Sequence, residues 1–286
     1  MTGTPEPVHI VGAGRAGLGL AGALAAAGKP VVLLARHEVK APATVQVIPD
    51  AALWPAALSA AGLVLLAVPD DAIEKVARQL APHLPAKAVV LHLSGLRDRS
   101  ALKPLAGKVA ATGSFHPLQS LVDPLDAPMH LRGAVAALEG DGEAVAAGRR
   151  LAQHLRMQPV ELLAEQKAAY HAAAALVSNG AVTLAGLAED LLSAAGIRDL
   201  PGHRMVGPLL TGTAHNVERL GAGEALTGPI RRGDAKTVQT HLDTLPLGLR
   251  PLYVALGRET LRIAREQGLE SARAEAVEKV LRSGSV

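Results

Sequence analysis

The sequence predicts an α/β fold: a Rossmann-type, doubly wound parallel sheet followed by an all-helical C-terminal domain. Short apolar runs with the length of buried strands alternate with helical segments in the N-terminal half. A glycine-rich turn joins the first run to the first helix. After Leu163 the strand pattern ends and long segments with helical character follow. We therefore expect two domains, residues 1–163 and 164–286.

The glycine-rich turn is the strongest functional signal. It follows the apolar run Val8–Val11 and precedes an alanine-rich helix that extends to Gly28. Strand, G-x-G-x-x-G and helix in this order are typical of a dinucleotide site, where the helix N-terminus receives the phosphates. A purely structural turn is the alternative. The expected cofactor-binding residues here are Gly12, Ala13, Gly14, Arg15, Ala16 and Gly17.

Arg36 indicates which dinucleotide binds. The second expected strand, residues 30–35, ends at this arginine. An NAD site usually has an acidic residue about 20 residues after the glycine turn, where it binds the ribose 2′-hydroxyl. A guanidinium instead pairs with a 2′-phosphate. The sequence therefore predicts NADP (NADPH), with a solvated arginine at a strand end as the alternative.

Further strands are expected over residues 44–48, 63–68, 88–93, 109–112, 132–139 and 158–163. Asp50 precedes an expected helix over residues 51–61, and Asp70 with Asp71 is expected to cap the helix after the strand at 63–68. In a doubly wound sheet, ligands bind outside the carboxyl ends of the strands. This rule adds Val68, Pro69, Ser94 and Gly95 to the cofactor site, Ser114 to the substrate site, and His116 to the catalytic candidates.

A helix over residues 165–179 carries a polar stripe on an otherwise alanine-rich surface. At 100° per residue, Lys167, His171 and Ser178 share one face, and Tyr170 and Asn179 flank it. Buried polar groups need partners, so this stripe indicates either a site or the edge of a domain or subunit interface.

A second polar cluster surrounds the segment Thr227-Gly-Pro229. It contributes a hydroxyl, free backbone amides and Arg231, a combination that suits a bound carboxylate. A plain loop with solvated arginines is the alternative.

Composition excludes several classes of function. The 286 residues include no cysteine, which excludes disulfides and thiolate chemistry. Aromatic residues make up 1% and the formal charge is only +3, so the sequence lacks the basic, aromatic-containing surface that is typical of nucleic-acid-binding proteins. The histidines lack metal-site spacing, and no G-x-S-x-G elbow occurs. We see no apolar run of the length a membrane span needs, and expect a cytoplasmic protein with no membrane or nucleic-acid partner.

The chain resembles bacterial Rossmann-like proteins whose C-terminal half is a domain of unknown function. These are relatives of ketopantoate reductase, pyrroline-5-carboxylate reductase and the 6-phosphogluconate dehydrogenase group. The resemblance covers nearly the whole chain and implies an NADP-binding domain, an all-helical domain and a homodimer formed through those helices. The wider group often has an Asn four residues after a helical Lys, whereas here His171 follows Lys167. The motifs that carry the resemblance are Gly12–Gly17, His92–Gly95, Gly113–Ser120, Tyr170–Ala174, Ser178-Asn179 and Leu226–Asp234.

We expect hydride transfer from NADPH to a small carbonyl compound that bears a carboxylate, as in ketopantoate reduction. The proton would come from His171, with Lys167 and His116 as the next candidates. Asn179 would orient the substrate, with Ser114 and Tyr170 beside it, and Thr227 with Arg231 would hold the carboxylate. A cyclic imine reductase resembling pyrroline-5-carboxylate reductase is one alternative. A non-catalytic NADP-binding sensor or scaffold is another.

Overall fold

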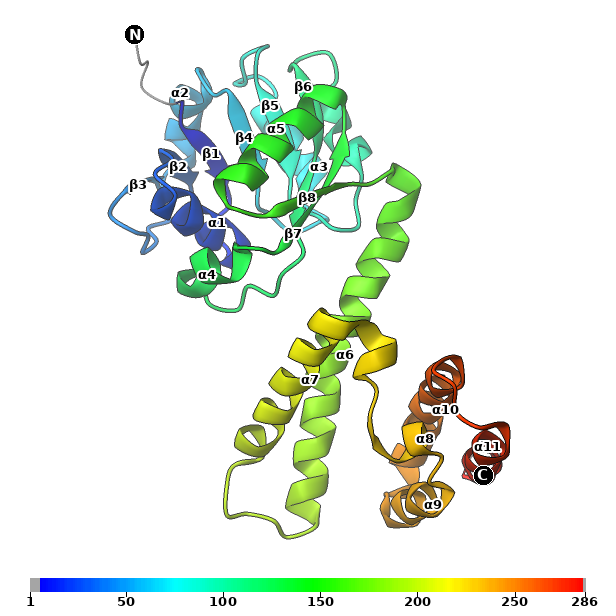
Figure 1. Ribbon diagram of the computed structural model, residues 1–286. Coiled ribbons are helices and arrows are strands. Elements are labelled where there is room, and N and C mark those ends of the chain that lie inside the picture. The colour runs from blue at the N-terminus through cyan, green and yellow to red at the C-terminus, as the bar shows by residue number, and fades with distance from the viewer. Residues whose placement is uncertain (1–5, 285–286) are drawn as a thin grey trace. The chain divides into compact units, whose positions relative to one another are not determined.

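The computed structural model describes residues 6–284 (Figure 1). The chain forms two compact units, a first unit that ends at Gly180 and a second unit that begins at Ala181. The last strand ends at Glu161 and the long helix α6 (Lys167–Ala194) begins shortly afterwards. The boundary expected near residue 163 thus lies between the sheet and the helices, whereas the compact units divide within α6.

One eight-stranded sheet organises the first unit, in the order β3-β2-β1-β4-β5-β6-β7-β8. Strands β2 and β3 extend the sheet on one side of β1, and the chain then crosses over to form β4 on the other side, so the topological switch point lies at β1. Every neighbouring pair is parallel, as expected, except β6 and β7, which are antiparallel. The strands are β1 (Val8–Val11), β2 (Val31–Leu34), β3 (Val45–Ile48), β4 (Leu63–Leu66), β5 (Val89–His92), β6 (Ala111–Pro117), β7 (Val135–Gly140) and β8 (Gln158–Glu161).

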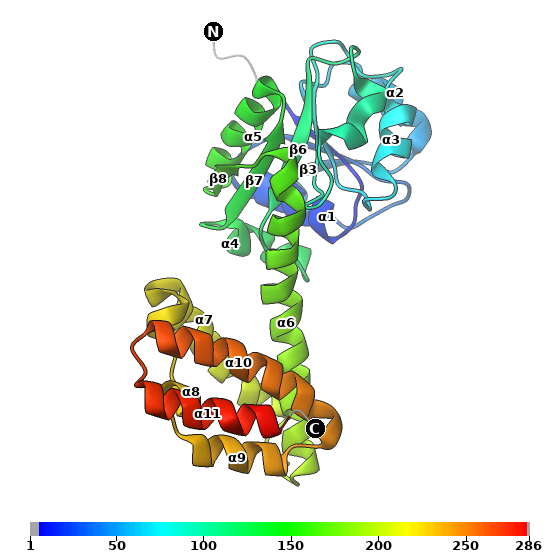
Figure 2. The same ribbon diagram turned by 90° about the vertical axis from the view of Figure 1, so that its right-hand side faces the viewer.

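Helices cover both faces of this sheet. Successive strand residues point to opposite faces, so Leu33 and Leu65 join one apolar core while Leu34 and Leu66 join the other. The first core includes residues of α1 (Arg15–Ala26), α4 (Ala127–Leu131) and α5 (Gly142–His154). The second includes residues of α2 (Trp54–Leu58) and α3 (Ile73–Leu80). Figure 2 shows the two helical layers on either side of the strands. The doubly wound prediction is confirmed.

Three local expectations changed. Strand β6 continues to Pro117, so Ser114 and His116 lie within a strand and not in the turn after it. Asp70 and Asp71 do not cap α3, whose N-cap is Ala72 with no side-chain hydrogen bond. The helix expected over residues 51–61 is a 3-10 turn followed by the short α2, and the Asp50 side chain caps its start.

The second unit is helical throughout its described residues. After α6 it contains α7 (Gly202–Ala225), α8 (Gly228–Arg232), α9 (Ala235–Thr244), α10 (Arg250–Glu266) and α11 (Ser271–Ser283). Helices α8 to α11 share a core that includes Val238, Val254 and Val277. The helical segments are interrupted between Ala194 and Gly202, at the non-helical Gly221, and between Thr244 and Arg250.

The segment Ala164–Ala194 is long and apolar enough to cross a membrane by length and composition alone. One such helix is weak evidence for a membrane span, and polar residues such as His171 and Asn179 interrupt it, so it contains no unbroken apolar run of the length expected for a span. The same helix carries the polar stripe of Lys167 and His171.

Candidate functional site

The glycine turn lies at the carboxyl end of β1, between β2 and β4. Gly12 has φ 110°, and a Cβ atom there would collide with the carbonyl oxygen of Ala67. A Cβ at Gly17 would collide with the carbonyl oxygen of Gly12. Both glycines are therefore required by the fold itself, because the turn, strand β4 and helix α1 approach one another closely.

Gly14 differs, because a Cβ there would meet no atom within 4 Å. It is the N-cap of α1 and has no side chain to cap the helix, so the first-turn amides remain for a ligand. Ala13 and Ala16 complete the turn, and Arg15 is exposed beside it. This open flank at the switch point fits the diphosphate of a dinucleotide.

Arg36 lies just beyond β2 and is exposed. It makes no hydrogen bond or ion pair that is recorded in residues 6–284, so its guanidinium can receive a ligand. Val68 and Pro69 follow β4 at the same edge of the sheet, and Val68 packs against the second core. The structure therefore brings the predicted cofactor residues of three neighbouring strands to one edge.

A cavity of about 620 Å³ lies beside this edge in the first unit. One wall comes from the end of β6 and the residues after it, and the other from the first turns of α6. The sequence-predicted residues His116, Tyr170, His171 and Asn179 line it. The other lining residues are Leu118, Gln119, Ser120, Ala173, Ala174, Ala175, Val177 and Ser178.

Two histidines and a tyrosine form a polar cluster in the cavity. The Nδ1 atom of His116 lies 2.9 Å from the hydroxyl of Tyr170. The rings of His116 and His171 have centroids 6.4 Å apart. Gly95 lies against both rings, since a Cβ there would come within 2.9 Å of each. The Ser94-Gly95 turn of the sequence motif is thus needed for close packing against the two histidines.

Burial changes the acid–base properties of this group. It lowers the pKa of His116 to about 4, and the positive charges of Lys167 and His171 lower it further. It raises the pKa of Tyr170 to about 12. Both side chains are therefore neutral near pH 7, and both can donate and accept hydrogen bonds.

Lys167 does not line the cavity. Its side chain is 1% exposed, and its Nζ atom donates to the carbonyl oxygen of Ser94 at 3.2 Å and to the Ser114 hydroxyl at 2.8 Å. Burial lowers its pKa. The ammonium thus ties the start of α6 to the turn after β5 and to β6.

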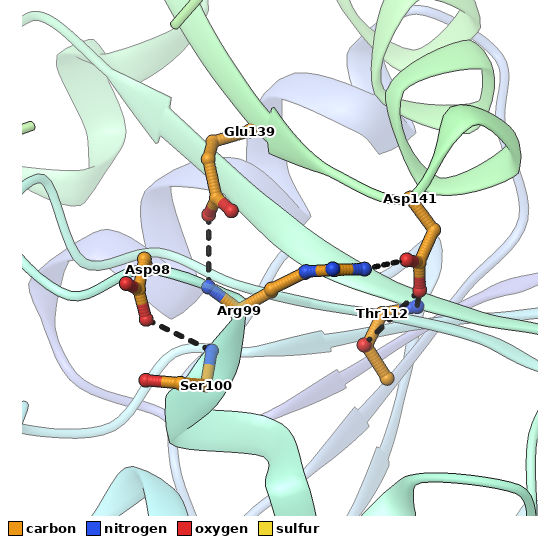
Figure 3. A network of polar contacts seen from close by, with 6 residues as sticks. All are labelled: Asp98, Arg99, Ser100, Thr112, Glu139 and Asp141. Atoms are coloured by element: carbon orange, nitrogen blue, oxygen red, sulfur yellow. Dashed lines mark hydrogen bonds and ion pairs between the residues drawn. The ribbon is translucent and has the colours of Figure 1, made fainter. Parts of the chain in front are cut away.

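Glu139 provides a negative charge for this buried lysine. It is 5% exposed, burial raises its pKa, and its Oε2 atom accepts a long hydrogen bond of 3.4 Å from Ser114. The same oxygen accepts from the backbone amide of Arg99 at 2.9 Å. Figure 3 shows that contact together with the neighbouring ion pair between Arg99 and Asp141. The buried charges are therefore linked into one network across β5, β6 and β7.

The hydroxyl and the backbone amide of Ser94 are both hydrogen-bonded within the turn after β5. Its hydroxyl donates to Asp70 Oδ2 at 2.7 Å and accepts from the amides of Leu96 and Arg97. Its own amide donates to His92 Nδ1 at 3.2 Å, so His92 Nε2 carries the proton and donates to the Asp98 carbonyl oxygen at 3.0 Å. Burial lowers the pKa of this fully buried histidine to about 4.

Sequence reasoning missed Asp70, His92 and Glu139 as parts of the site. The sequence predicts that Asp70 caps a helix, whereas in the structure its carboxylate accepts a hydrogen bond from the Ser94 hydroxyl. The signal for Glu139 was available, because it is a carboxylate at the end of the apolar run 135–138. The predicted residues Thr227 and Arg231 belong to the second unit, where they line a different cavity, of about 630 Å³.

Two family models match the sequence. A Rossmann-like domain model matches residues 5–117, and a model described as a domain of unknown function, DUF2520, matches residues 134–260. The chain therefore combines a Rossmann-like domain with a DUF2520 domain, as the resemblance implied. A search of curated proteins found no match.

Solved structures with the same fold come from several organisms. A Bacteroides fragilis protein, provisionally described as an NADP oxidoreductase, is 23% identical with a TM-score of 0.64, and the match covers 92% of this chain and 98% of that one. Reductive aminase from Aspergillus terreus, in complex with NADPH and ethyl-5-oxohexanoate, is 18% identical with a TM-score of 0.57, covering 98% and 93%. Plasmodium falciparum pyrroline carboxylate reductase with NADP bound is 15% identical with a TM-score of 0.55, covering 98% and 97%. These similarities show that the fold is shared.

Proposed function

We propose that this chain, a Rossmann-like domain joined to a DUF2520 domain, is an NADP(H)-dependent oxidoreductase that reduces a small carbonyl compound bearing a carboxylate. The observation that carries the proposal is the open flank of Gly14 at the switch point, near a cavity with two histidines and a tyrosine. NADPH, when bound, supplies a hydride. The chain's own residues must bind the coenzyme, orient the substrate and provide a proton.

The coenzyme assignment has two supports. Arg36 is the first charged residue after β2, at the position at which a 2′-phosphate is recognised, and the first carboxylate, Glu38, comes two residues later. The titles of three structures of this fold name NADP, NADPH or an NADP oxidoreductase. We therefore assign NADP(H) to this chain.

For proton delivery we propose His171. Hydride addition to a carbonyl carbon leaves negative charge on the oxygen, and a positioned acid must neutralise it. His171 lines the cavity, with His116 and Tyr170 beside it as the next donors. Lys167 is bonded to Ser94 and Ser114 beneath this wall, where it holds the helix in place. Asn179, further along the same cavity, would orient the substrate.

No arginine or lysine lines the cavity of the first unit. We propose separately that Thr227 and Arg231, which line the cavity of the second unit, can bind a carboxylate. We further propose a homodimer formed through the C-terminal helices, as the resemblance implies.

A screen of NADPH oxidation over small 2-oxo acids and cyclic imines tests the proposed function. With a 2-oxo acid as substrate, we expect His171→Ala to lower kcat about 100-fold, the usual contribution of a general acid, with an unchanged Kd for NADPH. His203→Ala, at an exposed position on α7 outside this cavity, is the control. Wild-type turnover by the H171A variant would remove the assignment.

Reduction of a cyclic imine is the second candidate, and it is favoured by the fold shared with pyrroline carboxylate reductase and a reductive aminase. An iminium substrate arrives already protonated, so H171A would affect its reduction much less than that of a 2-oxo acid. A non-catalytic sensor remains the third candidate. Tight NADPH binding without turnover of any compound in the screen would favour it.

A further inference from the structure

The cavity of the second unit joins two segments that are distant in the sequence. One is the Leu226–Arg232 segment at the junction of α7 and α8, and the other is the turn between α10 and α11 with the first residues of α11. The cavity measures about 630 Å³. Its lining residues are Leu226, Thr227, Gly228, Arg231, Arg232, Gly268, Leu269, Glu270 and Arg273.

Charge is unevenly distributed in this lining. Arg231, Arg232 and Arg273 face a single carboxylate, that of Glu270. Asp234, the next acidic residue along the chain from Arg232, caps α9 through bonds to the amide and hydroxyl of Thr237 at 3.0 and 2.7 Å. These bonds lower its pKa and the charge of Arg232 lowers it further, so Asp234 offsets part of the charge of Arg232, and the three arginines still exceed the two carboxylates. Cations brought together without enough counter-charge repel one another, and a bound anion would relieve that repulsion.

Two of the arginines are oriented by the backbone. One terminal nitrogen of Arg231 donates to the carbonyl oxygen of Gln267 at 3.1 Å, and one of Arg273 donates to the carbonyl oxygen of Arg232 at 3.4 Å. These contacts leave the second terminal nitrogen of each guanidinium group to donate hydrogen bonds to a ligand. The Arg232 side chain makes no hydrogen bond or ion pair recorded in the described part of the chain.

The carboxylate of Glu270 would compete with a bound anion for Arg273. One of its oxygens lies 3.4 Å from Nε of Arg273, and both side chains are more than 60% exposed. An ion pair so open to water is weak, so an incoming anion can displace the carboxylate.

We propose that this cavity is a binding site for the carboxylate or phosphate group of a small ligand, held by Arg231, Arg232 and Arg273. This proposal extends the carboxylate site of Thr227 and Arg231 by two further arginines, Arg232 and Arg273. The identification of the bound anion as part of the substrate rests on the proposed oxidoreductase function, whereas the binding of an anion in this cavity is independent of it.

The test is a titration of the full-length protein with acetate, malonate and inorganic phosphate, saturated with NADP⁺ so that the glycine turn is blocked. The readout is the movement of the backbone amide signals of Gly228 and Gly268 in ¹H–¹⁵N spectra. We expect saturable shifts with at least one of these anions. A preference for the carboxylates indicates a carboxylate ligand, and a preference for phosphate indicates a phosphorylated one.

Variants decide whether the arginines are responsible. Arg232→Gln and Arg273→Gln are each expected to weaken binding about tenfold, the effect of losing one charge-assisted hydrogen bond. Glu270→Gln is expected to tighten binding, a result that a loss of folding could not produce. Arg282→Gln, on the same helix but outside the lining, is the control.

Either of two results would overturn the proposal. One is the absence of saturable shifts at Gly228 and Gly268 with all three anions. The other is binding of equal affinity in the wild type and in the R232Q and R273Q variants. Because no turnover is measured, failure of the oxidoreductase proposal would appear separately, in the NADPH assays.

Discussion

At the scale of single residues, Arg36 carries the coenzyme preference. Its guanidinium is exposed after β2 with no recorded partner among residues 6–284. We expect Arg36→Ala to raise the Kd for NADPH at least about tenfold, because a charge-assisted contact to the 2′-phosphate is lost, and to change the Kd for NADH little. Isothermal titration with both coenzymes measures this. Arg150→Ala, at another exposed position, is the control, and equal weakening of both coenzymes would contradict the assignment.

His92 makes a second residue-scale prediction, which concerns pH. Its folded pKa of about 4 lies below the ordinary value of 6.5, because the imidazole is buried. As the pH falls below 6.5, His92 becomes protonated in the unfolded chain, whereas in the folded chain it stays neutral until about pH 4. The stabilisation is therefore complete above pH 6.5 and is lost towards pH 4.

The expected loss for His92 is on the order of 3 kcal/mol of the free energy of unfolding. Urea denaturation at a series of pH values measures it. In the His92→Gln variant, whose residue 92 cannot take up a proton, the curve of stability against pH should be flatter. Identical slopes in H92Q and the wild type would show that the histidine is not held neutral.

At the scale of elements, the glycine turn contains residues with two different tasks. Gly17→Ala places a methyl group against the Gly12 carbonyl oxygen, and we expect it to cost at least about 2 kcal/mol of stability. Gly14→Ala meets no protein atom and should change stability by no more than about 1 kcal/mol. The same methyl group would obstruct a diphosphate, so G14A should bind NADPH at least about tenfold more weakly.

Thermal denaturation and NADPH titration of the two glycine variants separate these tasks. If G14A bound NADPH as tightly as the wild type while remaining folded, the diphosphate would not lie against this turn. The G17A variant serves as the contrast, because its loss is one of folding.

At the scale of the whole molecule, the helical part exposes a large apolar surface. Leu176, Val182 and Leu209 are each more than 70% exposed, which is unusual for side chains of this size. In the proposed homodimer this surface would be buried. We expect sedimentation analysis to show a dimer and Val182→Asp to shift it towards monomer, because the charge would lose its hydration in the interface. Lys279→Asp on α11 is the control, and a monomeric wild-type protein would refute the dimer.

The sequence by itself determined the features that depend on neighbouring residues. The apolar runs, the glycine turn and the breaks between helices are local patterns, so the sheet, its switch point and the helical second part could be predicted. The stripe of Lys167 and His171 on one helical face was also readable, since helical periodicity fixes which side chains share a face.

Only the tertiary structure decided what each polar side chain does. Lys167 and Ser114 are 53 positions apart, and Ser94 and Asp70 are 24 apart, so no local pattern indicates their contacts. The helical period placed Lys167 beside His171, but burial against β5 and β6 turned its ammonium into the sheet while His171 faces the cavity. Arg273 likewise joined Arg231 through packing of α8, α10 and α11. Such pairings depend on which surfaces the folded chain brings together, because burial and charge interactions act across space and not along the sequence.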